Sequence, residues 1–398
     1  MNQTVALSDK IFWVGVNDWE TPLFEAMWPL PQGISYNSYL IVDDKTALID
    51  AVKQPFLPNL VGQIEQLLPA GKTLDYLIIN HVEPDHSSAL KLLPRLFPEM
   101  QIVGNKRTAD LLASYYGITS PLHLVSEGEV LDLGRHQLTF HITPMIHWPE
   151  TMMTYESSEK VLFSGDAFGG FGALEGGIFD DEIKVEYFEN EILRYYANIL
   201  GKFSPMVQKA LARLKALEMG IIAPAHGPVW RQNPHYILDR YNRWSSHQTE
   251  PGAVIVYGSM YANTQQMAEA AARGLAEAGV RDIRLHHASS SPLSDILTDA
   301  WRFKGLILGS CTYETRLFPP MRQVVDIFSE KGLGENRRLG LFGSYGWSGG
   351  AVKELRDFAA RGNWTMVDPI VEVKGAPSQD TLNQCALLGK NMADAVKS

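Results

Sequence analysis

The sequence contains very little cysteine, with only Cys311 and Cys385 among 398 residues. This excludes a disulfide framework, and no Cys-x-x-Cys pair is present for a rubredoxin-type or zinc-ribbon site. Because this cysteine usage gives no sign of disulfide bonds, we expect a protein of the reducing cytoplasm.

Excess positive charge and long apolar runs are also missing. The formal net charge is −10 at pH 7, which argues against a nucleic-acid-binding face, because such a face needs clustered basic residues. No apolar run approaches the roughly 20 residues of a membrane span. The first residues lack the basic and apolar regions of a signal peptide. We therefore expect a protein that binds neither nucleic acid nor membrane, in a chain long enough for two domains.

The apolar pattern changes near residue 250. Before it, short apolar runs alternate with turn-rich segments, which indicates layered sheet and helix. Residues 240–253 are polar and contain Pro-Gly, so we expect a linker there and domains at 1–249 and 250–398. In the first domain we expect helices at 60–69 and 191–201 and strands at 36–44, 45–50, 73–80, 101–105, 136–143 and 159–165.

After residue 250, strands and helices alternate regularly. This rhythm is typical of a doubly wound parallel sheet of the flavodoxin type. The expected helices are 264–279, 319–332 and 350–362, and the expected strands are 253–259, 282–288, 305–310, 337–344 and 364–375.

Four potential metal ligands lie within six residues, directly after the apolar run 74–80: His81, Glu83, Asp85 and His86. In an extended chain, the first three would lie on one side. The proline at position 84 would keep the residue before it extended, and a helix would follow over 87–96. The alternative is a set of solvated charges at a strand end, with Asp85 capping the helix.

Three later residues strengthen the metal interpretation. His147, Asp166 and His226 are each the first strong metal ligand after a strand-like run. Carboxylates suit harder, higher-valent ions, whereas zinc favours nitrogen and sulfur ligands. Ligand type alone nevertheless leaves a site with two zinc ions open. Three other histidines lack this placement and are interpreted as ordinary polar residues: His123, His136 and His141.

This order of ligands resembles the dinuclear site of the metallo-β-lactamase fold. Glu83 stands where the hydrolases of that fold usually have histidine, and this is similar to the flavodiiron proteins, also called A-type flavoproteins. The similarity extends over the whole chain and to the string GSYGWSGG at 343–350. It implies a metallo-β-lactamase-like αββα sandwich followed by a flavodoxin-like domain, in the two-domain form without a fused rubredoxin.

The resemblance also implies the ligand sets. One iron would take His81, Glu83 and His147. The other would take Asp85, His86 and His226, although the family varies in whether the histidine at position 86 coordinates. Asp166 would join the two irons.

Three strand ends in the second half indicate a flavin site. The loop after 254–258 has small and hydroxyl residues and then a helix, whose backbone N–H groups could bind a phosphate. It resembles the flavodoxin phosphate loop, except for Ala262 where flavodoxins commonly carry glycine. The expected FMN contacts are Ser259, Met260, Tyr261, Ala262, Asn263, Thr264, Cys311, Thr312, Tyr313, Ser344, Tyr345, Gly346, Trp347 and Gly349.

Together the two sites imply an oxidoreductase that passes electrons from FMN to a diiron centre and reduces O2 to water, NO to N2O, or both. The resemblance further implies a head-to-tail homodimer or dimer of dimers. Because the chain lacks Cys-x-x-Cys, an external donor such as rubredoxin or a reduced deazaflavin is expected. Five aromatic residues would line the metal pocket or serve as plain core: Trp148, Phe168, Phe171, Tyr195 and Tyr196.

Two alternatives stay open at this point. A zinc hydrolase with an attached flavodoxin-like domain would use a metal-bound hydroxide, and Glu83 argues against it. A non-catalytic electron carrier with a vestigial metal site would show ligand decay, but all seven ligand positions are filled.

Overall fold

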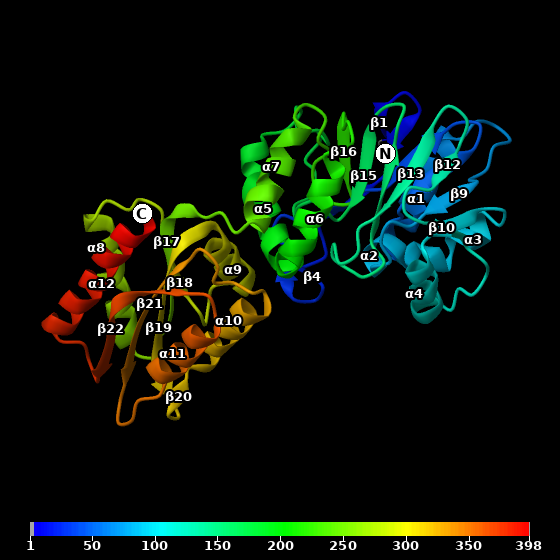
Figure 1. Cartoon of the computed structure of the whole chain (residues 1–398). Coiled ribbons are helices and arrows are strands. Elements are labelled where there is room, and N and C mark those ends of the chain that lie inside the picture. Colours follow the sequence, from blue (N-terminus) through cyan, green and yellow to red (C-terminus); the bar gives the residue numbers. More distant parts are fainter. Residues whose placement is uncertain (1–3, 398) are drawn as a thin grey trace. The chain divides into compact units, whose positions relative to one another are not determined.

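The computed structural model describes residues 4–397. The chain divides into two compact units, one up to Asn242 and one from Arg243 onward (Figure 1). Within the described range, no helix combines the length and the apolar character that a membrane crossing requires. Both cysteines are buried and free.

The first unit is built on two sheets. Neighbouring strands among the first four of the first sheet, in spatial order, are antiparallel. The fourth to seventh strands are parallel to one another. Its spatial order is β1 (Val5–Ser8), β2 (Ile11–Trp13), β7 (Tyr39–Val42), β8 (Thr46–Ile49), β9 (Tyr76–Ile78), β10 (Gln101–Gly104) and β11 (His123–Leu124).

The second sheet has five strands, and only its last pair is parallel. Its order is β12 (Val130–Asp132), β13 (Gln137–Ile142), β14 (Met152–Glu156), β15 (Val161–Gly165) and β16 (Ile221–Pro224). Two short antiparallel pairs lie between β2 and β7 in the chain and were not expected from the sequence: β3 (Val16–Asp18) with β6 (Ile34–Tyr36), and β4 (Leu23–Phe24) with β5 (Trp28–Pro29).

The hydrophobic core of the first unit lies between the two sheets. Ile49 and Ile78 of the first sheet and Phe140 and Phe163 of the second belong to one buried cluster. All five residues of β15 are buried, as a near-continuous apolar strand should be. The helices lie beside the sheets in Figure 1: α1 (Leu57–Leu67), α2 (Pro84–Ser87), α3 (Leu93–Leu96), α4 (Lys106–Tyr116), α5 (Val185–Tyr195), α6 (Ser204–Leu214) and α7 (Pro234–Ser245). The expected αββα sandwich is confirmed.

The second unit is one parallel sheet in the order 2-1-3-4-5, the flavodoxin order. The strands in this order are β18 (Ile283–His287), β17 (Glu250–Gly258), β19 (Phe303–Tyr313), β21 (Arg338–Tyr345) and β22 (Thr365–Lys374), and β20 (Arg316–Leu317) pairs with β19. The helices are α8 (Asn263–Glu277), α9 (Leu293–Arg302), α10 (Pro319–Glu330), α11 (Ala351–Arg361) and α12 (Gln379–Lys397). The doubly wound prediction is confirmed.

Two glycines let α8 and α12 pack closely. A Cβ atom on Gly274 would lie 2.0 Å from the backbone oxygen of Ala386, and one on Gly389 would lie 2.0 Å from that of Ala271. Both helices cover one face of the sheet, where Met267, Leu388 and their neighbours form a buried cluster.

Two local expectations were wrong. Residues 87–96 do not form one helix, because a 3-10 turn over Ser88–Lys91 separates α2 from α3. Proline 84 is the first residue of α2, a position that needs no backbone N–H, and Glu83 before it is extended as expected. The segment 240–253 is not an irregular linker either, because α7 runs to Ser245 and β17 begins at Glu250.

Candidate metal centre and cofactor cavity

The seven predicted metal ligands all lie at strand ends or in the loops that follow. His81 and Glu83 follow β9, and the short helix α2 then carries Asp85 and His86. His147 lies in the loop between β13 and β14, and Asp166 and His226 follow β15 and β16. Since β15 and β16 are parallel neighbours, their ends meet at the same edge of the second sheet.

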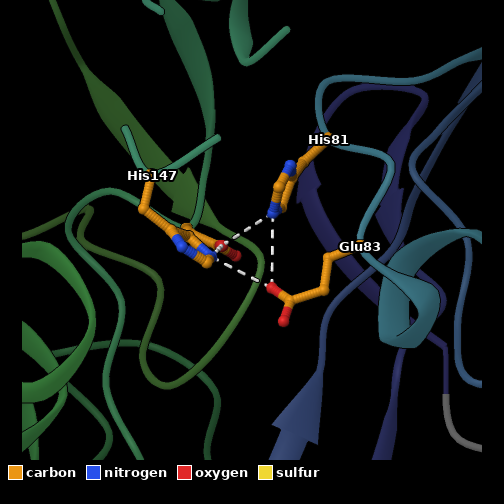
Figure 2. A group of neighbouring side chains, drawn as sticks. His81, Glu83 and His147 are labelled. Atoms are coloured by element: carbon orange, nitrogen blue, oxygen red, sulfur yellow. Dashed lines mark hydrogen bonds and ion pairs between the residues drawn. The ribbon is translucent and has the colours of Figure 1, made fainter. Parts of the chain in front are cut away.

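The first group of side chains consists of His81, Glu83, His147 and Asp166, whose ligand atoms lie within 4.8 Å of one another. Glu83 Oε2 is 3.3 Å from His81 Nε2 and 3.0 Å from His147 Nε2. Figure 2 shows His81, Glu83 and His147 pointing toward one another. All four side chains are buried.

The second group consists of Asp85, His86 and His226. Asp85 Oδ2 lies 3.5 Å from His86 Nε2 and 3.3 Å from His226 Nε2. Asp85 was expected on the same side as His81 in an extended chain, and this expectation is wrong. Because the helix begins at residue 84, Asp85 turns toward His86 and the second group.

Asp166 lies between the two groups and offers one carboxylate oxygen to each. Its Oδ2 is 3.4 Å from His81 Nε2 and 3.1 Å from His147 Nε2. Its Oδ1 is 3.0 Å from His86 Nε2 and 3.6 Å from His226 Nε2. A carboxylate in this position can join two metal ions.

The cluster raises the pKa values of His81, His147 and His86. Burial lowers the pKa of His81, but the Asp166 carboxylate and further hydrogen bonds outweigh it and raise the pKa to about 10. Burial likewise opposes the charge on His147, whose hydrogen bonds to Asp166 and Glu83 raise its pKa to about 10. The pKa of His86 rises to about 9 because its nearby carboxylates outweigh burial.

The pKa values of Glu83 and Asp166 shift in the opposite direction. Burial alone would raise the pKa of Glu83, but the hydrogen bonds with His147 and His81 hold it well below the usual range. For Asp166 the surrounding imidazoles outweigh burial in the same way and hold the pKa far below its usual value. Without metal, the protons therefore lie on the imidazoles, and a cation has to displace them.

The histidines differ in the hydrogen-bond partner of Nδ1, the ring nitrogen on the side away from the cluster. His81 Nδ1 donates to Glu150 Oε1 at 2.8 Å, and this glutamate is fully buried. His226 Nδ1 donates to the backbone carbonyl of Ser35 at 2.7 Å. His86 Nδ1 has no hydrogen-bond partner among the described residues. The sequence argument missed Glu150, although it follows His147 by only three positions.

Aromatic rings surround part of the cluster. The ring of Tyr195 lies 5.5 Å from that of His226, and the ring of Trp148 lies 5.1 Å from that of His81. The ring of Phe171 lies 5.0 Å from that of Tyr195, so Phe171 packs behind Tyr195 as seen from the ligands.

Two further expected aromatic residues lie in the core, and two that were not expected lie near the cluster. Phe168 and Tyr196 both pack against Tyr241, at 4.8 Å and 5.0 Å, which is consistent with a core role. Phe24 and Tyr36 were missed by the sequence argument, and their rings lie 5.7 Å and 5.9 Å from the ring of His226. They come from the short N-terminal strands, for which the sequence carried no clear signal.

The second unit has a cavity of about 460 Å³ at the carboxyl ends of β17, β19 and β21. Of the predicted FMN contacts, all but Ala262 and Gly349 line it, and Glu314 and Gly375 are added. Trp347 and Tyr261 are 84% and 85% exposed at this cavity, so two aromatic faces are open to a ligand.

The loop before α8 has the form of an anion site. Ala262 precedes the helix in a left-handed conformation, with φ of +65°, where glycine is usual. Thr264 Oγ1 is hydrogen-bonded to Ser344 Oγ at 2.9 Å and ties two of the loops together. The buried Ser259 Oγ has no hydrogen-bond partner in the described part of the chain, which suits a loop that receives a phosphate at a helix N-terminus.

Comparison with known proteins identifies both halves. Residues 34–227 match the family model described as ODP family beta lactamase, and residues 255–389 match the flavodoxin model. A nitric oxide reductase from Moorella thermoacetica is 36% identical over 399 residues, which cover 99% of each chain. An anaerobic nitric oxide reductase flavorubredoxin from Escherichia coli O1:K1 is 36% identical over 98% of this chain and 82% of its own.

Solved structures agree over nearly the whole chain. The flavodiiron protein from Giardia intestinalis superposes with a TM-score of 0.94 at 28% identity, over 99% of this chain and 97% of that one. The rubredoxin oxygen:oxidoreductase from Desulfovibrio gigas gives a TM-score of 0.94 at 30% identity, over 99% of each chain. The chain belongs to the flavodiiron protein family. It is therefore an oxidoreductase, and the resemblance inferred from its sequence is confirmed.

The residues present in this flavodiiron protein fit a metal pair. Both oxygens of Asp85 and of Asp166 and the Nε2 atoms of His86 and His226 are buried without a well-aligned hydrogen bond among residues 4–397, and only ion-pair contacts of 3.0–3.6 Å join them. Buried polar atoms without partners are costly unless something binds them. The donor set of imidazoles and carboxylates is one that iron accepts, and the flavodoxin unit implies FMN.

Proposed function

We propose that this flavodiiron protein uses electrons from FMN to reduce O2 to water, NO to N2O, or both, at a diiron centre. The observation that carries the proposal is the position of Asp166, whose two carboxylate oxygens face two separate groups of ligands. Both substrates have support from relatives, since one is named a nitric oxide reductase and another a rubredoxin oxygen:oxidoreductase. Neither of these two relatives is named as a hydrolase.

We assign the ligands as the grouping of the side chains suggests. One iron would be held by His81, Glu83 and His147, the other by Asp85, His86 and His226, and Asp166 would be shared. When bound, the two irons would supply the redox chemistry for a small diatomic substrate, and FMN would supply single electrons.

The protein's own groups would exclude water and orient the substrate. Tyr195 is fully buried, and its hydroxyl has no hydrogen-bond partner within residues 4–397. Burial raises its pKa well above the ordinary value, so the hydroxyl stays protonated. It is therefore available to donate a hydrogen bond to a substrate at the cluster, beside the ring of His226.

We propose that FMN binds in the cavity at the strand ends of the second unit. Its phosphate would lie at the start of α8 near Ser259, and its ring system near Tyr313 and Trp347. We place the domain division at 1–249 for the diiron domain and 250–398 for the FMN domain. The two family models fall on either side of it, at 34–227 and 255–389.

The electron donor and the assembly are also proposals. We propose rubredoxin or a reduced deazaflavin as the donor, and the name of the Desulfovibrio gigas structure supports the first. We further propose a cytoplasmic head-to-tail homodimer or dimer of dimers, with the FMN of one chain beside the diiron centre of the other.

Anaerobic rapid mixing tests the reaction. The iron-loaded protein, with its FMN reduced by dithionite, is mixed with NO or with O2, and flavin absorbance is followed. Fast flavin reoxidation by NO is expected, together with its loss in Asp166→Asn, which keeps FMN bound. The experiment with O2 is done in the same way, and its rate of flavin reoxidation is compared with that of free FMN. Reoxidation no faster than that of Asp166→Asn with either gas would contradict the proposed function.

A further inference from the structure

The two groups of metal-ligating side chains differ in the charge behind their histidines. Behind His81 stands the carboxylate of Glu150, which can only accept and therefore takes the Nδ1 proton at 2.8 Å. Behind His226 stands a neutral backbone carbonyl. His86 Nδ1 has no hydrogen-bond partner within the described residues. Of these three histidines, only His81 donates its Nδ1 proton to a carboxylate.

Glu150 is held firmly in this position. Its Oε1 also accepts the backbone N–H of Val82 at 2.9 Å, so one oxygen ties the loop after β9 to the loop before β14. Its backbone carbonyl accepts from Asn105 Nδ2 at 2.5 Å, and Asn105 is the N-cap residue of α4. Arg107 donates to the carbonyl of Pro149 at 3.0 Å. The carboxylate is therefore built into the site.

A carboxylate behind a ligating imidazole changes the ligand in two ways. It fixes the tautomer, so that Nε2 of His81 faces the cluster with its lone pair. It also draws the Nδ1 proton toward itself, which makes the ring more basic and a stronger donor to a cation. A neutral carbonyl also fixes the tautomer, but it increases the basicity of the ring much less.

We propose that Glu150 is a positioning residue that makes the two metal positions inequivalent, so that the position of His81, Glu83 and His147 holds iron more tightly and favours its higher oxidation state. The proposal rests on the proposed diiron function and adds a rank order to the two sites. Through His81, Glu150 adds negative charge behind the first position only. The irons should therefore leave, and be reduced, in a defined sequence.

Chelator release from the iron-loaded protein tests this order. Under anaerobic conditions, excess ferrous chelator should remove the two irons in a fast and a slow phase. His147→Ala, which disrupts the first position, should lose the slow phase. Glu150→Gln keeps an acceptor oxygen and the side-chain volume but removes the charge, and should speed the slow phase by about 10–100-fold while leaving the fast phase unchanged.

A matched control separates the charge from a general loss of structure. Glu156 is also fully buried, at the end of β14, where its carboxylate accepts the backbone N–H groups of Ser158 and Glu159. Glu156→Gln makes the same chemical change outside the cluster and should leave both phases unchanged. Glu150→Asp, which keeps a charge at a longer distance, should give an intermediate slow phase. The circular dichroism spectrum and the thermal unfolding midpoint report the integrity of each variant.

The redox behaviour gives a second readout. In a potentiometric titration followed by the mixed-valent electron paramagnetic resonance signal, the two one-electron steps should move closer together in Glu150→Gln than in the unaltered protein. A single release phase in the unaltered protein, equal acceleration of both phases, or equal rates for Gln and Asp at position 150 would overturn the inference. Failure to load two irons per chain would instead refute the proposed function, so the two failures are distinguishable.

Discussion

Replacement of Glu83 by alanine should remove one iron and leave the flavin. Glu83 Oε2 lies 3.0 Å from His147 Nε2 and 3.3 Å from His81 Nε2 and belongs only to the first group. The substitution leaves the first position with two imidazoles and one oxygen of the shared Asp166. The second group keeps all of its side chains.

The size of the effect follows from the ligand count and the charge. Losing even an outer partner of a ligand typically weakens metal binding about 10–100-fold, so loss of a direct carboxylate ligand should cost at least about 100-fold. Two ferrous ions carry four positive charges, and the cluster offers three carboxylates. Without Glu83 only two remain, and the first position becomes the less neutralised one.

The assay is iron and FMN content of protein purified without oxygen. Glu83→Ala should hold about one iron and about one FMN per chain, compared with about two irons in the unaltered protein. Glu127→Ala is a suitable control, because it removes a half-exposed carboxylate that pairs with His141 and Arg213 outside the cluster. Retention of both irons in Glu83→Ala would refute the ligand assignment, and loss of FMN would show that the two sites are not independent.

Three further predictions concern the flavin loops and the metal-free cluster. Trp347→Ala should shift the flavin absorption spectrum or midpoint potential without loss of stability, because this side chain is 84% exposed at the cavity; an unchanged spectrum and potential would remove it from the FMN site. Ala262→Gly should raise the free energy of unfolding by roughly 0.5–1 kcal/mol, since it relieves a left-handed alanine at the expense of unfolded-chain entropy; urea denaturation that shows equal or lower stability would contradict this. Metal uptake at pH 7 should release protons, because the pKa values of His81 and His147 are raised to about 10 without metal, and an indicator dye that detects no release would count against the raised values. The same shifts mean that the ion pairs stabilise the metal-free protein below about pH 6.5 and that this stability is lost as the pH rises through about 10.

The ligand cluster could be located from the sequence because its members follow buried strands. An apolar run that stops at a histidine or aspartate places that residue at a sheet edge whatever the helix boundaries are. This is why Asp166 and His226 were found although the sequence argument misjudged the turn around residue 84. The flavin loops were found for the same reason, since β17, β19 and β21 end where their small and polar residues begin.

What the sequence could not supply is the surroundings of the ligands. Glu150 contacts His81 across 69 positions in sequence, and a lone glutamate in a loop carries no periodic signal. Phe24 and Tyr36 come from short strands that depend on tertiary pairing for their form. Residues 87–96 were misjudged because Pro94, which stands in the first turn of α3, was not interpreted as a break in the helix.

The measurement that tests the account most directly is the metal and flavin content of anaerobically purified protein. We predict about two irons and about one FMN per chain, with both irons lost and FMN retained after treatment with a strong chelator. Zinc in place of iron, or a single metal ion in the presence of excess iron, would contradict the central claim that Asp166 joins a pair of irons.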